Sequence, residues 1–290
     1  MAKAMNSENI GLKQGKALAN LTSSKQLDLI AEGLPVLMNS ARELLEASRL
    51  LNGKDRAANI LEGLAIEEIA KILILIDIVR CPSKIRSSRI GPMMSWFYDH
   101  LARLIYFEAQ TWKPVNGKQL QEYVNGHRES HYLEGEYGEL IAPNWSLWLS
   151  ESTLYVDLMS DENGELSWNE PISIPQLFDD FTPCPWRVCQ SLSKFGAFSR
   201  KGLEIVSSVW GKVNFDADQN WSEARNLTHE MLSKLNAAHL FTVDAADDDV
   251  SNLHRFWQMP MYNIDFKKIN VSIKNLQAVR DANILSEFGL

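Results

Sequence analysis

Two short segments of the chain carry side chains suited to proton transfer and phosphate binding. One contains His100 and Arg103, and the other contains Glu67, Glu68 and Lys71. A histidine titrates near neutral pH and can give or take a proton, whereas an arginine matches the charge and geometry of a phosphate. We therefore interpret His100 as an acid or base, Arg103 as a phosphate ligand, and Glu68 as the group that orients one of them.

Helices are expected to position these residues. Apolar residues recur at helical spacing over three ranges, 34–51, 54–79 and 92–112. Asn52-Gly53 predicts a tight turn between the first two helices, and Pro92 fits the first turn of the third. Another helix is expected near 8–33. The range 54–79 is apolar nearly all round, which predicts the central buried helix of a bundle.

The third helix is expected to present one face to a carboxylate of the second. Four of its residues follow at spacings of four, three and four: Trp96, His100, Arg103 and Phe107. Glu68 falls among apolar residues, where an unpaired carboxylate is costly, so it needs a cation. Glu67 and Lys71 have the spacing of a helical ion pair. The alternative interpretation is a buried ion-pair network that only fixes the register of the helices.

The charge of the chain is unevenly distributed. The 29 Lys and Arg and 37 Asp and Glu give a net charge of −8, which excludes a protein that is basic all over. Residues 1–115 are nevertheless net positive, and the acidity belongs to the remainder. A basic cluster within 80–103 predicts an RNA-facing cleft, with Glu67, Lys71, Arg86 and Arg89 as substrate-binding residues. The alternative is a solvated loop with scattered arginines.

The rest of the chain predicts a mainly α protein with a small β-hairpin. The range 113–150 contains several Gly and Pro residues and is expected to be a connecting or insert region, with a short helix near 117–132. Two strands, 153–158 and 165–168, flank a turn at Asn163-Gly164. Further helices are expected at three ranges, 186–213, 221–240 and 272–285, and an acidic loop at 244–249. The expected parts are a helical bundle at 1–115, a connecting insert at 116–172 and a helical C-terminal region at 173–290.

Other candidate sites are weaker. His127, His131 and Glu134 have a metal-like spacing, but an exposed loop or helix is favoured, and Cys184 and Cys189 lack a second pair for zinc. No phosphate loop or dinucleotide motif occurs, so neither metal nor cofactor is expected. Three cysteines and the absence of a long apolar run or an apolar signal core predict a cytoplasmic protein that does not enter the membrane.

Several segments resemble the AbiV-type abortive infection proteins. The resemblance is carried by four segments: the run from Asn39 to Leu51, the run from Ala57 to Lys71, Phe97-Tyr-Asp-His-Leu-Ala-Arg103, and the hairpin Leu154–Asp157 with Trp168 and Pro171. The segment Met259-Pro-Met-Tyr262 is similar to the same family. The resemblance implies phage defence in bacteria and kinship with the HEPN superfamily, whose helical bundles often form homodimers and act as metal-independent RNases.

In active members of that superfamily, four to six residues separate an Arg from the His that follows it. This chain has no such pair, and His100 precedes Arg103. Two hypotheses therefore stand. The first is an abortive infection protein that arrests the infected cell by cleaving RNA. The second is a non-catalytic inhibitor or sensor that binds a phage or host protein, which the acidic C-terminal part favours because it repels nucleic acid. A helical housekeeping or regulatory protein is the third interpretation.

Overall fold

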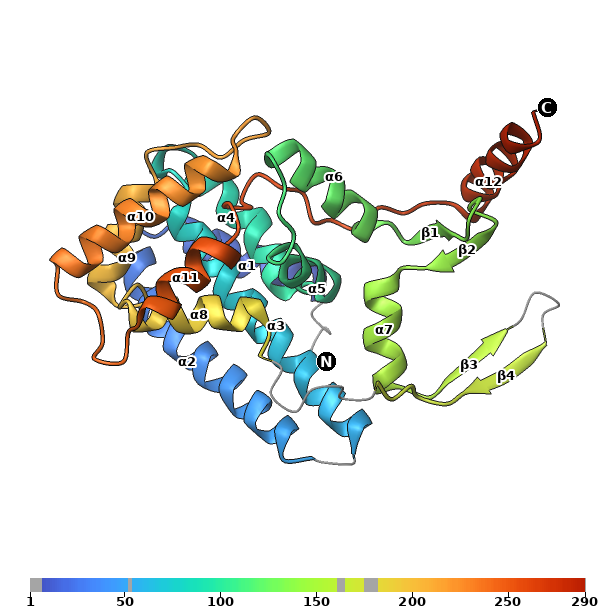
Figure 1. Cartoon of the computed structure of the whole chain (residues 1–290), viewed down its shortest axis with the longest axis horizontal. Helices are drawn as coiled ribbons and strands as arrows, with labels where there is room; N and C mark the ends of the chain where they lie inside the picture. Colours follow the sequence, from blue (N-terminus) through green and yellow to red (C-terminus); the bar gives the residue numbers. More distant parts are fainter. Residues whose placement is uncertain (1–6, 52–53, 161–164, 175–181, 290) are drawn as a thin grey trace, which may run out of the picture.

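Helices dominate the structure. The computed structural model describes residues 7–51, 54–160, 165–174 and 182–289, and these residues form twelve helices and four short strands. Figure 1 shows a helical body and, extending to one side of it, an arm that contains both hairpins and the last helix. The predicted class, mainly α with a small β-hairpin and a helical C-terminal region, is confirmed.

A buried helix forms the centre of the body. The helix α3 (Asp55–Arg80) is flanked along its length by α2 (Ser23–Arg49), and α5 (His100–Ala109) packs on another side. The helix α4 (Ser83–Tyr98) contacts α3 and is covered by α1 (Ser7–Ala19). Residues 72–80 of α3 are buried without exception, and the apolar pattern predicted a buried helix here.

Two predicted helix boundaries are wrong. The helix expected at 34–51 begins at Ser23, where the Thr22 side chain accepts a hydrogen bond from the Lys25 amide, and Pro35 lies inside it. The helix expected at 92–112 is two helices. Asp99 separates them, because its backbone is extended and its carboxylate accepts a hydrogen bond from the Ala102 amide at 2.8 Å. An N-cap of this kind starts a new helix at the next residue.

Four helices of the C-terminal region complete the body. They are α8 (Cys184–Lys194), α9 (Arg200–Trp210), α10 (Trp221–Ala237) and α11 (Asp247–Phe256). The single helical pattern expected at 186–213 breaks at Gly196, whose φ of 71° suits glycine. The acidic loop expected at 244–249 is shorter than predicted, because α11 begins at Asp247. Asp249 is buried in the first turn of α11, where it accepts hydrogen bonds from Ser191 and from the Ala246 amide.

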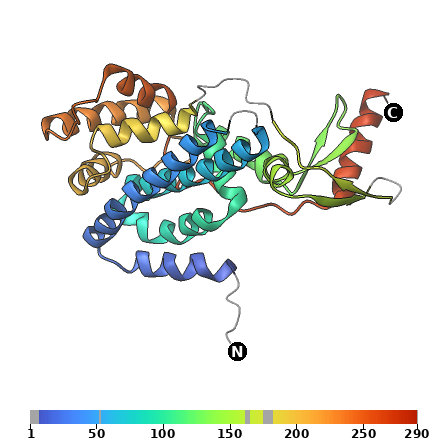
Figure 2. The ribbon, with the colours of Figure 1, turned by 90° about the horizontal axis from the view of Figure 1, so that it is seen from below.

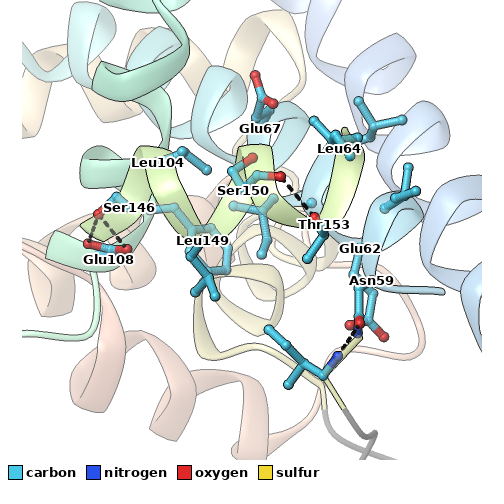
Figure 3. Close-up of a pocket in the computed structure, with 16 residues that line it drawn as sticks. Asn59, Glu62, Leu64, Glu67, Leu104, Glu108, Ser146, Leu149, Ser150 and Thr153 are labelled. Atoms are coloured by element: carbon cyan, nitrogen blue, oxygen red, sulfur yellow. Dashed lines mark hydrogen bonds between the residues drawn. The ribbon is translucent and has the colours of Figure 1, made fainter. Parts of the chain in front are cut away.

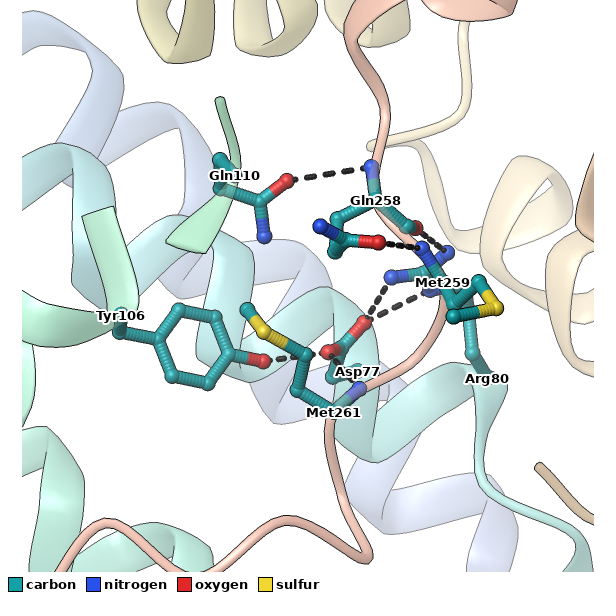
Figure 4. A network of polar contacts seen from close by, with 7 residues as sticks. All are labelled: Asp77, Arg80, Tyr106, Gln110, Gln258, Met259 and Met261. Carbon is teal, nitrogen blue, oxygen red and sulfur yellow. Dashed lines mark hydrogen bonds and ion pairs between the residues drawn. The ribbon is translucent and has the colours of Figure 1, made fainter. Parts of the chain in front are cut away.

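A buried carboxylate ties the C-terminal segment to α3. Asp77 has no exposed surface and accepts hydrogen bonds from the Arg80 guanidinium at 2.7 Å, the Met261 amide at 2.8 Å and the Tyr106 hydroxyl (Figure 4). Burial and the charge of Asp77 both raise the pKa of Tyr106, which stays protonated and donates. Every contact of this carboxylate is therefore internal.

Arg80 completes the same network. Its guanidinium donates to the Gln258 carbonyl at 2.9 Å and lies 4.6 Å and 4.4 Å from the ring centroids of Trp210 and Trp257. Two aromatic faces around one cation are strongly stabilising when water is excluded. One hydrophobic core accordingly runs through both the predicted bundle at 1–115 and the predicted C-terminal region.

The arm contains the remaining elements. They are α6 (Gly117–Arg128) at its base, β1 (His131–Glu134), β2 (Leu140–Pro143), α7 (Trp145–Leu154), β3 (Asp157–Ser160), β4 (Leu166–Asn169) and α12 (Ile273–Glu287). Figure 2 shows from a second direction that α12 and both hairpins lie on the same side of the body. The chain returns to the arm through a backbone pairing of Glu129 with Ile269, and α12 contacts β1 and β2.

The predicted hairpin exists, and a second one was missed. Strands β3 and β4 are antiparallel, with Leu158 opposite Trp168, whereas Thr153 and Leu154 end α7 instead of starting the strand. The expected turn at 163–164 lies outside the described residues. The missed hairpin, β1 with β2, has four residues a strand and no clear alternation of burial, so no periodicity marked it. None of the described helices combines the length and the apolarity needed to cross a bilayer.

Candidate functional site at Glu67, His100 and Arg103

One carboxylate of α3 holds two side chains of α5. Glu67 is 9% exposed, and its Oε1 accepts a hydrogen bond from Nδ1 of His100 at 2.9 Å. Its Oε2 forms an ion pair with the Arg103 guanidinium, which also donates to the Phe97 carbonyl at 3.2 Å. His100 is the first residue of α5, so the Asp99 cap, which fixes the start of this helix, also fixes the backbone position of His100. The structure thus brings together three of the predicted site residues.

The contact expected of Glu68 is made by Glu67. Glu68 instead pairs with Lys71 at 2.7 Å, both side chains being about one fifth exposed, and the Lys71 ammonium lies 5.7 Å from the Phe97 ring centroid. Adjacent helical residues point about 100° apart, so an error of one residue selects a different neighbour. Because α3 is apolar nearly all round, its pattern did not indicate which glutamate faces α5.

The contacts among Glu67, His100 and Arg103 shift the pKa values of Glu67 and His100. Burial alone would raise the pKa of Glu67, but the hydrogen bond and charge of His100 and the charge of Arg103 outweigh it, so this pKa lies below 4.5. The hydrogen bond to Glu67 raises the pKa of His100 above 6.5, against the opposing effect of burial. Glu67 is therefore an anion, and His100 keeps its proton to a higher pH than an ordinary histidine.

A serine that the sequence did not indicate occupies the other ring nitrogen. Ser150 Oγ lies 3.2 Å from Nε2 of His100, and Ser150 belongs to α7 of the arm. The end of α7 is held on α3 by Arg56, which donates to the carbonyls of Thr153 at 2.9 Å and Leu154 at 3.0 Å. When His100 is protonated, both ring nitrogens donate, Nδ1 to Glu67 and Nε2 to Ser150. No local sequence signal links Ser150 to His100.

A cavity borders this cluster. It has a volume of about 310 Å³ and lies among α3, α5 and α7 (Figure 3), with apolar walls from Leu64, Leu104, Phe107 and Leu149. Glu67 and Ser150 are both in its wall, so His100 bridges two lining residues. Two more carboxylates, Glu62 and Glu108, line it, and the described lining contains no Lys, Arg or His. This composition suits a neutral or cationic group better than a phosphate.

The three residues with a metal-like spacing, His127, His131 and Glu134, do not form a cluster. His127 Nδ1 lies 3.2 Å from Glu108, whose carboxylate also accepts hydrogen bonds from the Ser146 hydroxyl, while His131 lies on β1. Within the part of the chain that the structure describes, no three side chains of His, Cys, Asp or Glu gather in a way that could hold a metal ion. His127 therefore contacts Glu108, which lines the cavity.

Arg86 and Arg89 lie away from Glu67. Arg86 is 4% exposed and donates to the carbonyls of Val79 and Cys81, which end α3. Arg86 and Arg89 both act electrostatically on the Cys81 thiol, which places them at this end of the helix. Cys81 is about 20 Å further along the helix axis than Glu67, at 1.5 Å per residue. The basic residues of 80–103 are thus dispersed: Arg80 and Arg86 are buried, Arg89 is half-buried and Lys84 is exposed. Arg103 lies at the Glu67 site.

Comparison with family models, curated proteins and solved structures finds no match to this chain. The geometry alone therefore describes what the site can do. It offers an imidazole held by a carboxylate, a guanidinium on the same carboxylate, and a hydroxyl at the rim of a cavity. Such a set is suited to general acid catalysis and to binding a polar group at the edge of an apolar pocket.

Proposed function

We propose that this protein defends a bacterial cell against phage by abortive infection, and that it arrests the infected cell by acting on RNA in the cytoplasm. The observation that carries the mechanism is the Glu67 carboxylate binding both His100 and Arg103. The AbiV-like segments support the biological role, because two of them contain these three residues. The same resemblance leads us to propose a homodimer.

The chemistry needs no metal. The 2′-hydroxyl oxygen of a nucleotide attacks the adjacent phosphorus, the bond from phosphorus to the 5′ oxygen breaks, and a 2′,3′-cyclic phosphate forms. The protonated form of His100, which Glu67 favours by raising its pKa, gives its proton to the departing 5′ oxygen, and the 2′-hydroxyl proton passes to solvent. Arg103 lies beside the developing negative charge. Ser150 releases Nε2 when the substrate arrives.

A phage challenge tests the biological role. Bacteria expressing the wild type, His100→Gln or His131→Gln are infected with a panel of phages, and plaques and surviving cells are counted. The proposal predicts fewer plaques with the wild type and with His131→Gln, because His131 on β1 takes no part in the site, and loss of protection with His100→Gln. Equal plaque numbers with the wild type and an empty vector would contradict the proposal.

A second candidate function is inhibition by protein binding without catalysis. The cavity beside the cluster favours it, because three carboxylates line it and its described lining has no cation to attract RNA. On this account, Glu67, His100 and Arg103 fix α5 against α3, and a phage or host protein is bound elsewhere. Protection that persists in His100→Gln while RNA remains intact would favour this candidate over cleavage.

A further inference from the structure

The β3–β4 hairpin exposes apolar side chains that no other described part of the chain covers. Leu158, Leu166 and Trp168 are 53%, 67% and 72% exposed. Leu158 pairs with Trp168, and Leu166 stands two residues before Trp168 on the same strand, so the three share one face. We call these three side chains the hairpin face. Tyr155 and Val156, each 57% exposed, lead into it.

An uncovered hairpin of this kind is unusual for a protein that acts alone. A two-stranded hairpin is marginally stable in water unless a further strand or helix covers its apolar side. Contiguous exposed apolar groups on a soluble protein commonly mark an interaction site. Here β3 and β4 form a sheet of their own, and every described residue of β4 except Asn169 is exposed. The hairpin face is therefore suited to burial against another molecule.

The charge of the segment around the hairpin indicates what kind of partner could bind there. Residues 129–186 contain twelve Asp and Glu and no Lys or Arg. Asp157 and Glu170 lie at the open end of the hairpin, next to its apolar face. Such a surface repels RNA and anionic lipid, and it also repels the same surface of a second copy. The complementary surface is a cationic rim around an apolar patch.

We propose that the β3–β4 hairpin is the docking site for a basic protein, whose apolar patch covers Leu158, Leu166 and Trp168 while its Lys and Arg side chains face the acidic arm. Trp168 is the central anchor, because large aromatic side chains carry much of the energy of protein interfaces. The proposal goes beyond RNA cleavage and does not depend on it, since the hairpin face shares no residue with the Glu67 cluster.

The test uses the whole chain and short labelled peptides, with binding followed by fluorescence anisotropy. The probe is an amphipathic helix of leucine and lysine, compared with the same design in leucine and glutamate. We expect the lysine peptide to bind, the glutamate peptide not to bind, and added salt to weaken the complex. The double variant Leu166→Ser, Trp168→Ser is expected to bind the lysine peptide about tenfold or more weakly.

A matched control removes equally exposed apolar groups elsewhere. Leu50 and Val243 are 84% and 107% exposed and lie outside the arm, so Leu50→Ser, Val243→Ser should bind as the wild type does. Equal affinity of the wild type and the hairpin variant would overturn the proposal, as would equal binding of the two peptides. A wild-type dimer that the hairpin variant converts to monomers in light scattering would also overturn it, because a second copy would then cover the face.

Discussion

Glu67 on α3 and His100 on α5 are joined by a hydrogen bond of 2.9 Å between Oε1 and Nδ1. The bond settles two properties of the imidazole at once. It holds Nδ1 as a donor, which leaves Nε2 as the nitrogen that can exchange a proton, and it favours the charged ring. Arg103 on the other carboxylate oxygen then keeps Glu67 ionised. The candidate site thus depends on Glu67 more than on the neighbouring Glu68.

Replacing Glu67 should move the titration of His100. In Glu67→Gln the largest contribution to the raised pKa of His100 is lost and burial remains, so this pKa should fall below its wild-type value. Ser150→Ala should leave the pKa of His100 raised, because the carboxylate is intact. Titration of the His100 ring by NMR measures both changes, with His131 as an internal reference. An unchanged His100 pKa in Glu67→Gln would show that another group sets it.

The same pair should make stability depend on pH. A raised His100 pKa contributes stability that is fully present below about 6.5 and is lost as the pH rises through the folded-state pKa. The lowered Glu67 pKa contributes stability that is present above about 4.5 and is lost as the pH falls through its folded-state pKa. The advantage of the wild type over His100→Gln should therefore be largest between these values and smaller at pH 8.

Urea unfolding of the two proteins at pH 5.5 and pH 8 measures that difference. A control substitution at the half-exposed His131, on β1, shows how far the difference is specific to His100. A difference between the wild type and His100→Gln that grows from pH 5.5 to pH 8 would contradict the assigned direction of the His100 shift.

The buried Asp77 should be essential to the fold. Asp77→Ala leaves the Arg80 cation without its carboxylate and removes the acceptor of the Tyr106 hydroxyl and the Met261 amide. Breaking one side of a buried ion pair costs about 3–5 kcal/mol, so the free energy of unfolding should fall by that amount. Chemical denaturation measures it. Asp281→Ala, which removes a 60% exposed carboxylate, is the control and should cost less than about 1 kcal/mol. A cost below that of the control would contradict the structural role of Asp77.

The sequence predicted the elements better than their contacts. The apolar stretch of α3 was sufficient to place that helix, because a long apolar segment in a helical bundle is buried. The last helix was also placed, although Leu276 is its one buried residue. The division at Asp99 was missed because Trp96, His100 and Arg103 keep helical spacing across it. A single capping carboxylate overrides that spacing, and its effect depends on one backbone conformation.

The candidate site could be predicted only in part. His100 and Arg103 share one face of α5, and local spacing is enough to find such a pair. The orienting role was assigned to Glu68 instead of Glu67, because a helix buried on most sides has no polar face for orientation. Ser150 comes from α7, whose position depends on contacts with Arg56 and with the α5 region. Tertiary packing decides such partners, and periodicity does not report it.

Cleavage of RNA by the purified chain, with EDTA present, is the most direct test of the proposed mechanism. We expect fragments ending in a 2′,3′-cyclic phosphate, with a rate that falls as the pH rises through the raised His100 pKa. His100→Gln should lower the rate at least about 100-fold, as removal of a general acid does, and His131→Gln should not change it. RNA that stays intact with the wild type, or cleavage unchanged by His100→Gln, would contradict the account.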